Sequence, residues 1–290
     1  MIIEVNNLKK SYKNDEVLKG ITFKVREPNI IALVGPNGSG KTTLLDCMTN
    51  ILQPDQGNVH LLGKESTDSS LFFEVSYFQD NRVLYEELTG RQHLEFICRI
   101  QKLPISEVDY VAKKVNIASY MNKKVKKYSL GMKQHLLLAI AIINQPKLLI
   151  LDEPLNGMDP TSSINVRNLL LELHQMGTTI LISSHNLDEI DRLTNDIFFM
   201  KDGKIIQESI NDLEKEYYTI SVHNMEKAKQ VLNEDLDKVA FYDSYIQINT
   251  SKISLDSIIQ KLVKHEIKIV DVNKKTIGAE KRYQELYGGV

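Results

Sequence analysis

Short apolar runs recur along the first two hundred residues, separated by stretches of helical character. The runs Ile30–Val34 and Leu148–Leu151 carry no charge and predict strands buried within a sheet. Thr178–Ser184 predicts a further strand, whereas Thr42–Leu52 and Glu87–Ile100 predict helices. This alternation predicts an α/β fold class.

The C-terminal part of the chain has a pattern of its own. Apolar residues on both sides of Asp202-Gly203 predict a hairpin over residues 198–206. Strand, helix, one or two strands, helix and strand then follow at Tyr217–Val222, Met225–Leu232, Val239–Asn249, Ser254–Lys264 and Ile267–Val272, with a short helix near Ala279–Leu286. This order predicts a small α+β domain of ferredoxin-like type. We find no chemical motif in it.

The most specific motif joins the first buried strand to the helix after it. The sequence there matches G-x-x-x-x-G-K-[ST], and its residues are Gly35, Pro36, Asn37, Gly38, Ser39, Gly40, Lys41, Thr42 and Thr43. Glycines allow the backbone to wrap an anion, so that its N–H groups point at the β-phosphate. Lys41 brings a positive charge to the β- and γ-phosphates, and the Thr42 hydroxyl is a Mg²⁺ ligand. Because a helix N-terminus also favours phosphate, the motif predicts a nucleoside triphosphate site.

A pair of acidic residues follows the second buried strand. Asp152 and Glu153 stand at its C-terminal end, where ligands bind in open α/β sheets. Asp152 is the candidate for holding Mg²⁺ through water, and Glu153 is the candidate general base for the attacking water. Paired acids after a strand are as often a solvated loop, but their combination with the phosphate loop favours the catalytic interpretation.

The order of these and further motifs resembles that of the nucleotide-binding subunit of an ATP-binding cassette (ABC) transporter. Tyr128 to Gln134 is similar to the signature of that family, and Leu155 to Pro160 is similar to the loop that follows its catalytic glutamate. His185 stands at the position of the switch histidine, and Tyr12 at that of the aromatic residue that stacks on adenine.

The resemblance covers about residues 1–215 and implies a P-loop NTPase cassette, with a mixed sheet core and a helical signature subdomain over about residues 72–140. Residues 216–290 remain as an accessory domain. The cofactors implied are ATP and Mg²⁺. In the family, two cassettes bind head to tail, so Ser129 and the Gly131 N–H would contact the γ-phosphate of the second copy. Hydrolysis then removes the group that holds the halves together.

Three positions depart from the commonest family pattern. Leu130 replaces a glycine of the signature, and His135 replaces an arginine. In the glutamine loop, residue type favours Gln79 as the contact to Mg²⁺ and water, whereas the spacing to the following segment favours Asp80. We choose Gln79.

Composition and charge set limits on partners and compartment. The formal net charge of −2 gives no reason to expect a nucleic-acid partner. Lys123 to Lys127 is one basic cluster, and such a run is most often a solvated face. The two cysteines, Cys47 and Cys98, are too few for a disulfide framework, which favours an intracellular protein.

No stretch approaches the ~20 consecutive apolar residues that a membrane span requires. The longest apolar run, Leu136–Ile143, predicts a buried helix segment instead. A transporter of this kind therefore needs a separate integral membrane permease, whose short cytoplasmic helix would dock in a groove of the helical subdomain. We expect the chain on the cytoplasmic face of the membrane.

The signature, the 155–160 loop and the small C-terminal domain resemble those of bacterial multidrug, bacteriocin-immunity and cell-envelope exporters. Two alternatives stay open at this point: an importer ATPase, and a cassette protein that acts on ribosomes, DNA or an assembly scaffold with no membrane partner. The transported substrate, and whether the partner cassette is a second copy or a paralogue, are not encoded in any residue that we identify.

Overall fold

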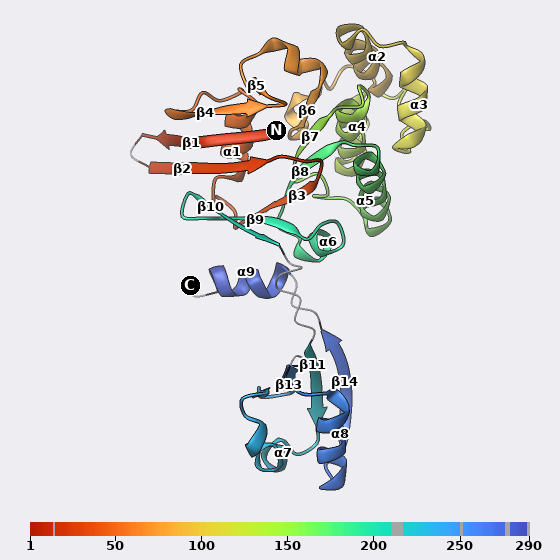
Figure 1. Ribbon diagram of the computed structural model, residues 1–290. Helices are drawn as coiled ribbons and strands as arrows, with labels where there is room; N and C mark the ends of the chain where they lie inside the picture. The colour runs from red at the N-terminus through yellow and green to blue at the C-terminus, as the bar shows by residue number, and fades with distance from the viewer. Residues whose placement is uncertain (14, 210–216, 250–251, 276–278, 289–290) are drawn as a thin grey trace. The chain divides into compact units, whose positions relative to one another are not determined.

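The computed structural model describes residues 1–13, 15–209, 217–249, 252–275 and 279–288 (Figure 1). The chain divides into two compact units, residues 1–208 and residues 209–290. The domain boundary expected at residues 215 and 216 falls in the segment 210–216, outside the described residues. The two units are described separately below.

The first unit is built around a six-stranded sheet. Its strands in spatial order are β10 (Lys204–Ser209), β9 (Asp196–Lys201), β3 (Ile30–Val34), β8 (Thr179–Ser184), β7 (Leu148–Asp152) and β6 (Val75–Phe78). The pairs from β9 to β6 are parallel. All five residues of β3 and all six of β8 are buried, as expected of strands covered on both faces.

A second, antiparallel sheet lies in the same unit. It contains β2 (Asp15–Val25), β1 (Ile3–Tyr12), β4 (Gln56–Leu61) and β5 (Lys64–Glu65), in that order. Helix α1 (Lys41–Met48) contributes Leu44, Leu45 and Met48 to one hydrophobic cluster with residues of both sheets. This shared cluster fixes the start of α1 relative to the end of β3.

Between β6 and β7 the chain forms the helices α2 (Gly90–Gln101), α3 (Ser106–Lys114) and α4 (Leu130–Ile142). Helix α2 begins with a capping box between Thr89 and Gln92, and α4 begins at the side-chain cap of Ser129. Helices α5 (Pro160–Gln175) and α6 (Leu187–Asp191) follow β7 and β8. Among the described residues, none of the helices has the length and apolar character needed to span a bilayer.

The second unit contains one antiparallel sheet in the order β12 (Val239–Phe241), β13 (Ile246–Asn249), β11 (Tyr217–Val222) and β14 (Ile269–Lys275). Helix α7 (Met225–Val231) lies between β11 and β12 in the sequence, and α8 (Leu255–Lys264) lies between β13 and β14. Both helices add apolar residues to the core of this unit. Helix α9 (Ala279–Tyr287) follows β14 in the sequence.

Candidate active site

The loop from Gly35 to Gly40 joins β3 to α1 and depends on its glycines. Gly38 and Gly40 have φ values of +81° and +99°, a region that favours glycine. A Cβ on Gly40 would lie 2.7 Å from Val17 Cγ1 and 2.9 Å from Met200 Cε, so side chains of two strands pack directly on the loop. Gly40 therefore has a steric reason to be glycine, in addition to the phosphate binding that the motif predicts.

Lys41 is the first residue of α1 and is only 6% exposed. Its ammonium donates to the carbonyl oxygens of Gly35 at 2.8 Å and of Pro36 at 3.3 Å. The same nitrogen lies 3.8 Å from Glu153 Oε1. A buried cation is thus held inside the loop and faces the acidic pair.

Thr42 and Asp152 are in direct contact. The Thr42 hydroxyl donates to Asp152 Oδ2 at 2.6 Å, and the Ser183 hydroxyl donates to Asp152 Oδ1 at 2.5 Å. Ser183 also accepts a hydrogen bond from the backbone N–H of Glu153 at 2.9 Å. The Ser183 side chain therefore orients both acidic residues. The sequence alone assigns it no role, although Ser183 lies in the segment that leads to His185.

The oxygen donors at this position fit Mg²⁺. A hydroxyl and a carboxylate are the hard ligands that the ion prefers, and phosphate oxygens of a substrate usually complete its shell. The described part of the chain contains no group of three or more His, Cys, Asp and Glu residues that could hold a metal without such help. Thr42 and Asp152 would hold the ion together with the nucleotide.

Glu153 lies between two cationic or polar groups. One carboxylate oxygen faces Lys41, and the other lies 2.7 Å from Nδ1 of His185. The Glu153 backbone has a φ of +50°, a left-handed conformation that is costly for a residue with a Cβ. His185 follows β8 and is exposed, so the Glu153–His185 pair lies at the open side of the site.

The strand register explains why these residues meet. Phe78 of β6 pairs with Leu151 of β7, and Leu151 pairs with Ile182 of β8. Gln79, half-buried, therefore follows β6 at the level where Asp152 ends β7. The carboxyl ends of parallel strands share one edge, so the sheet itself gathers this set of side chains.

Asp80 has a local structural role. Its side chain caps the short helix η2 (Asn81–Val83) and accepts from Arg82 N at 2.8 Å and Arg82 Nε at 2.6 Å. The Arg82 guanidinium holds the pKa of the Asp80 carboxyl below its usual value. Of the two glutamine-loop candidates, Asp80 is thus engaged with its own loop.

The signature residues form a second cluster, with the loop after Glu153. Ser129 is exposed, and its Oγ accepts from Met132 N at 3.2 Å to cap α4. Leu130, 47% exposed, covers Gly157, where an added Cβ would lie 3.0 Å from Leu130 Cγ. Gln134 Nε2 donates to the Asn156 carbonyl at 3.4 Å, which ties the same helix to the same loop.

The remaining candidates have diverse surroundings. Tyr12 lies at the end of β1, 49% exposed, with its ring open to solvent. His135 is half-buried on α4, and burial lowers the pKa of its ring. Cys47 and Cys98 are both free and buried, and burial raises the pKa of the Cys47 thiol to about 11, so neither is a reactive thiol.

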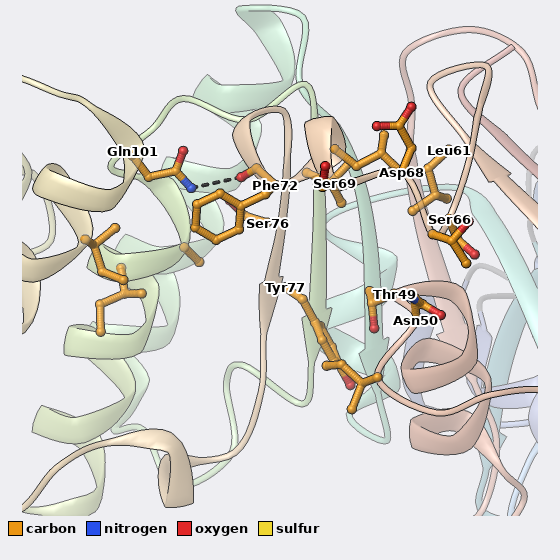
Figure 2. Close-up of a pocket in the computed structure, with 17 residues that line it drawn as sticks. Thr49, Asn50, Leu61, Ser66, Asp68, Ser69, Phe72, Ser76, Tyr77 and Gln101 are labelled. Atoms are coloured by element: carbon orange, nitrogen blue, oxygen red, sulfur yellow. Dashed lines mark hydrogen bonds between the residues drawn. The ribbon is translucent and has the colours of Figure 1, made fainter.

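A cavity of about 510 Å³ lies on the side of the unit where α2 and α4 meet the core (Figure 2). Its walls come from the end of α1, the segment 66–72, β6, α2 and α4. The lining residues are Thr49, Asn50, Ile51, Leu61, Ser66, Thr67, Asp68, Ser69, Leu71, Phe72, Val75, Ser76, Tyr77, Ile97, Gln101, Ile140 and Ala141. At one side Gln101 Nε2 donates to the Phe72 carbonyl at 2.9 Å. The exposed side chains of Phe72 and Ile51 add apolar surface there.

Comparison with known proteins gives consistent matches. A family model described as "ABC transporter" matches residues 18–156. The chain is 33% identical to the "Uncharacterized ABC transporter ATP-binding protein YcbN" of Bacillus subtilis (strain 168), over 99% of this chain and 97% of that protein. It is 32% identical to the "Bacitracin transport ATP-binding protein BcrA" of Enterococcus faecalis, again over 99% of this chain and 97% of that protein.

A solved structure described as an ATP-binding subunit of an ABC transporter matches with a TM-score of 0.68. The match covers 91% of this chain and 100% of that chain at 22% identity, so it speaks for the fold alone.

Proposed function

This chain belongs to the ATP-binding proteins of ABC transporters, ATPases whose hydrolysis of ATP drives transport, and we propose that it powers an exporter by closing as a dimer around two ATP molecules. Its first unit has the α/β cassette fold of that family. The observation that carries the proposal is the convergence of Lys41, Asp152 and Glu153 at one edge of the parallel sheet.

The nucleotide would bind over the loop between β3 and α1. Backbone N–H groups from Gly38 to Thr43 and the Lys41 ammonium would surround the β- and γ-phosphates. Thr42 and Asp152, already in contact, would hold Mg²⁺, which would neutralise phosphate charge when bound, with Gln79 as a further ligand. The half-exposed ring of Tyr12 would stack on adenine.

Glu153 would act as the general base. It accepts a proton from the water that attacks the γ-phosphorus, and the bond to the β-phosphate oxygen breaks to give ADP and phosphate. Its carboxylate is held between Lys41 and His185, and Ser183 fixes its backbone. His185 would contact the γ-phosphate and position the water.

Ser129 and Gly131 would complete the site of a second copy. An added Cβ on Gly131 would lie 3.7 Å from the Gly157 carbonyl oxygen, so Gly131 lies beside the 155–160 loop. Ser129 is exposed at the N-terminus of α4, where an incoming phosphate is favoured. Two copies arranged head to tail would each supply a signature to the ATP of the other. The isologous symmetry of such a dimer uses the same two surfaces twice.

The permease would dock at the 510 Å³ cavity. Its apolar lining residues, among them Leu71, Ile97 and Ile140, suit one or two apolar side chains of a short amphipathic helix. Asp68 at the rim would favour a basic residue on that helix. A chain bound in this way lies on the cytoplasmic face of the membrane as a peripheral subunit.

Export is supported by the relative named for bacitracin transport. The signature and the 155–160 loop also resemble those of bacterial exporters. An importer ATPase is the second candidate, because the site chemistry is the same in both directions. A role on ribosomes or DNA lacks a comparable observation.

The second unit would be a ferredoxin-like domain that stabilises the dimer. Its element order and its strand order, β12-β13-β11-β14, agree with a split βαβ sandwich. This assignment rests on topology, and the role rests on analogy of fold.

Co-purification tests transport. The chain would be expressed with an affinity tag in the organism that encodes it and recovered from detergent-solubilised membranes, and the polypeptides and nucleic acids bound to it would be identified. Recovery of an integral membrane protein that is lost when Ile97→Asp places a charge in the cavity supports the proposal. Recovery of ribosomes or RNA, without a membrane protein, contradicts it.

A further inference from the structure

His93, on α2, is a buried histidine that the nucleotide site leaves unexplained. It is 6% exposed, and both ring nitrogens are engaged. Nε2 lies 2.9 Å from the Tyr85 backbone N, and Nδ1 lies 2.8 Å from the Thr89 carbonyl oxygen. Because an amide N–H only donates, Nε2 must accept, so the ring proton resides on Nδ1 and the ring is neutral.

The Tyr85 amide lies at the far end of the glutamine loop. The chain leaves β6 at Gln79, and Asp80 caps the short turn that follows. Leu84 is buried, whereas Tyr85 is 67% exposed. The hydrogen bond to His93 therefore fixes the backbone of Tyr85. The exposed tyrosine side chain does not fix it by packing in the core.

The same segment is paired with the chain that leads into the signature. Val125 N donates to the Leu88 carbonyl at 2.9 Å, and Lys126 N donates to the Glu86 carbonyl at 3.0 Å. The hydrogen bonds lie just before Ser129, which starts α4. Residues 85–88 are thus joined by backbone hydrogen bonds to the residues that precede the signature.

Side chains add a second connection, which involves two of the four lysines in the basic cluster at residues 123–127. Glu87 pairs with Lys124 at 3.0 Å and with Lys126 at 2.8 Å, and Glu86 pairs with Lys133 of α4 at 3.3 Å. The two lysines beside Glu87 lower the pKa of its carboxyl to about 2. These groups are largely exposed, so solvent screens them, and the part-buried hydrogen bonds of the buried His93 ring are the firmer connection.

We propose that His93 is a positioning residue that fixes residues 79–89, the segment that runs from Gln79 of the glutamine loop to the start of α2. Binding of the nucleotide and Mg²⁺ at Gln79 is thereby transmitted to Ser129 of the signature. The roles of Gln79 and Ser129 rest on the proposed function above. The bond between Nε2 and the Tyr85 amide is the decisive contact, since it is a hydrogen bond that joins α2 to the loop side of this segment.

Three substitutions separate the two bonds of the ring. In His93→Gln the side-chain oxygen can reach the place of Nε2 and accept from Tyr85 N. His93→Asn keeps a donor at the place of Nδ1 and loses the Tyr85 bond. His93→Phe loses both bonds while filling the space.

Limited trypsin cleavage of the full chain reports the position of the loop. Arg82, with its side chain 88% exposed, lies within residues 79–89, whereas Lys102 lies at the opposite end of α2. We expect cleavage after Arg82 to be about tenfold faster in His93→Asn and His93→Phe than in the wild type, and unchanged in His93→Gln. Cleavage after Lys102 should stay constant in all variants.

Steady-state ATPase kinetics report the functional consequence. We expect kcat to fall about tenfold in His93→Asn and His93→Phe with the KM for ATP within about twofold, and kcat to be retained in His93→Gln. Wild-type cleavage at Arg82 in His93→Asn and His93→Phe would overturn the positioning role, as would an equal loss in His93→Gln. Faster cleavage with unchanged kcat would overturn the link to hydrolysis.

These outcomes are distinguishable from a failure of the proposed function. If Gln79 and Ser129 had no part in hydrolysis, Gln79→Ala and Ser129→Arg would retain the wild-type kcat, while the Arg82 cleavage pattern would still follow the Tyr85 bond.

Discussion

Oε2 of Glu153 lies 2.7 Å from Nδ1 of His185, and the Glu153 backbone that places it there has a left-handed φ of +50°. A non-glycine residue in this region costs of the order of 1–3 kcal/mol unless its surroundings enforce it. Ser183 enforces it, because its hydroxyl accepts the Glu153 N–H and donates to the neighbouring Asp152. The strain is therefore located at Glu153, the proposed general base.

Glu153→Gln should retain ATP binding and lose hydrolysis. The amide keeps the size of the side chain but cannot accept the proton of the attacking water, so kcat should fall roughly 10²- to 10⁴-fold. Phosphate release and equilibrium ATP binding, measured on the same preparation, check this. Turnover within a few-fold of the wild type would remove Glu153 as the base.

Lys41→Ala should weaken nucleotide binding itself. The substitution removes a buried cation that lies inside the loop, and its carbonyl contacts to Gly35 and Pro36 are lost as well. We expect the Kd for ATP to rise at least about tenfold. Calorimetric titration measures it, with the exposed Lys19→Ala as the matched control. An unchanged Kd would mean that the phosphates bind elsewhere.

Ser129→Arg should leave ATP binding by a single chain intact and block turnover. Ser129 is exposed where it caps α4, so the bulk of arginine affects the surface offered to the second copy. Ser106→Arg, at an exposed serine that starts α3, controls for added charge in the same subdomain. Equal turnover in the two variants would show that the signature takes no part in catalysis.

Gly157→Ala should perturb the contact between Leu130 and the loop after Glu153. Gly157 has a φ of +76°, and its added Cβ would overlap the Leu130 side chain. Gly177→Ala is the matched control, because Gly177 has a φ of +100° and an added Cβ there would have no atom within 4 Å. We expect the free energy of unfolding to fall by about 1 kcal/mol in both variants, because alanine is strained at a positive φ. We expect a loss of turnover in Gly157→Ala alone.

The double variant Leu130→Ala, Gly157→Ala then tests the clash. Partial recovery of turnover is expected, since the overlapping atoms are removed while the backbone strain remains. No recovery would assign the effect to the backbone.

Asp235 should stabilise the second unit in a pH-dependent manner. Its carboxylate is 2% exposed and pairs with Lys261 and Lys238, whose hydrogen bonds lower its pKa below the usual value. Since the folded pKa is below the unfolded one, the stabilisation is present above the unfolded pKa and is lost as pH falls through the folded pKa.

Asp235→Asn removes this contribution. Both lysines are partly exposed, so we expect the free energy of unfolding of the second unit to fall by only about 1 kcal/mol at pH 7. This loss should become smaller toward acid pH. Hydrogen exchange of the α8 amides measures it, and the exposed Asp237→Asn is the control. An equal effect in both variants, or one that grows in acid, would contradict this role.

Sequence patterns predicted strand bounds best. β3 and β11 have the expected bounds, Ile30–Val34 and Tyr217–Val222, because runs of strand-forming residues between turn residues leave little choice of where each strand begins and ends. Helix α4 begins six residues before the predicted apolar run at Leu136, since Ser129 caps it. Helix α1 ends at Met48, four residues before the predicted Leu52.

The candidate site was accessible from the sequence where a motif is continuous in the chain. The phosphate loop and the Asp152-Glu153 pair are such motifs. The orienting bonds of Ser183 and the neutral ring of His93 depend on residues brought together by folding, with no periodicity or spacing to mark them. The left-handed backbone of Glu153 likewise has no sequence signal, because glutamate rarely adopts it.

The dimer is the central claim, and its mass in solution tests it most directly. Size-exclusion chromatography with light scattering would be performed on Glu153→Gln, once with ATP and Mg²⁺ and once with ADP and Mg²⁺. We expect a dimer with ATP and a monomer with ADP, because the γ-phosphate would join the phosphate loop of one copy to Ser129 of the other. Removal of residues 217–290 should weaken this dimer without changing its dependence on ATP. A monomer in both nucleotides, or a dimer in both, would contradict the account.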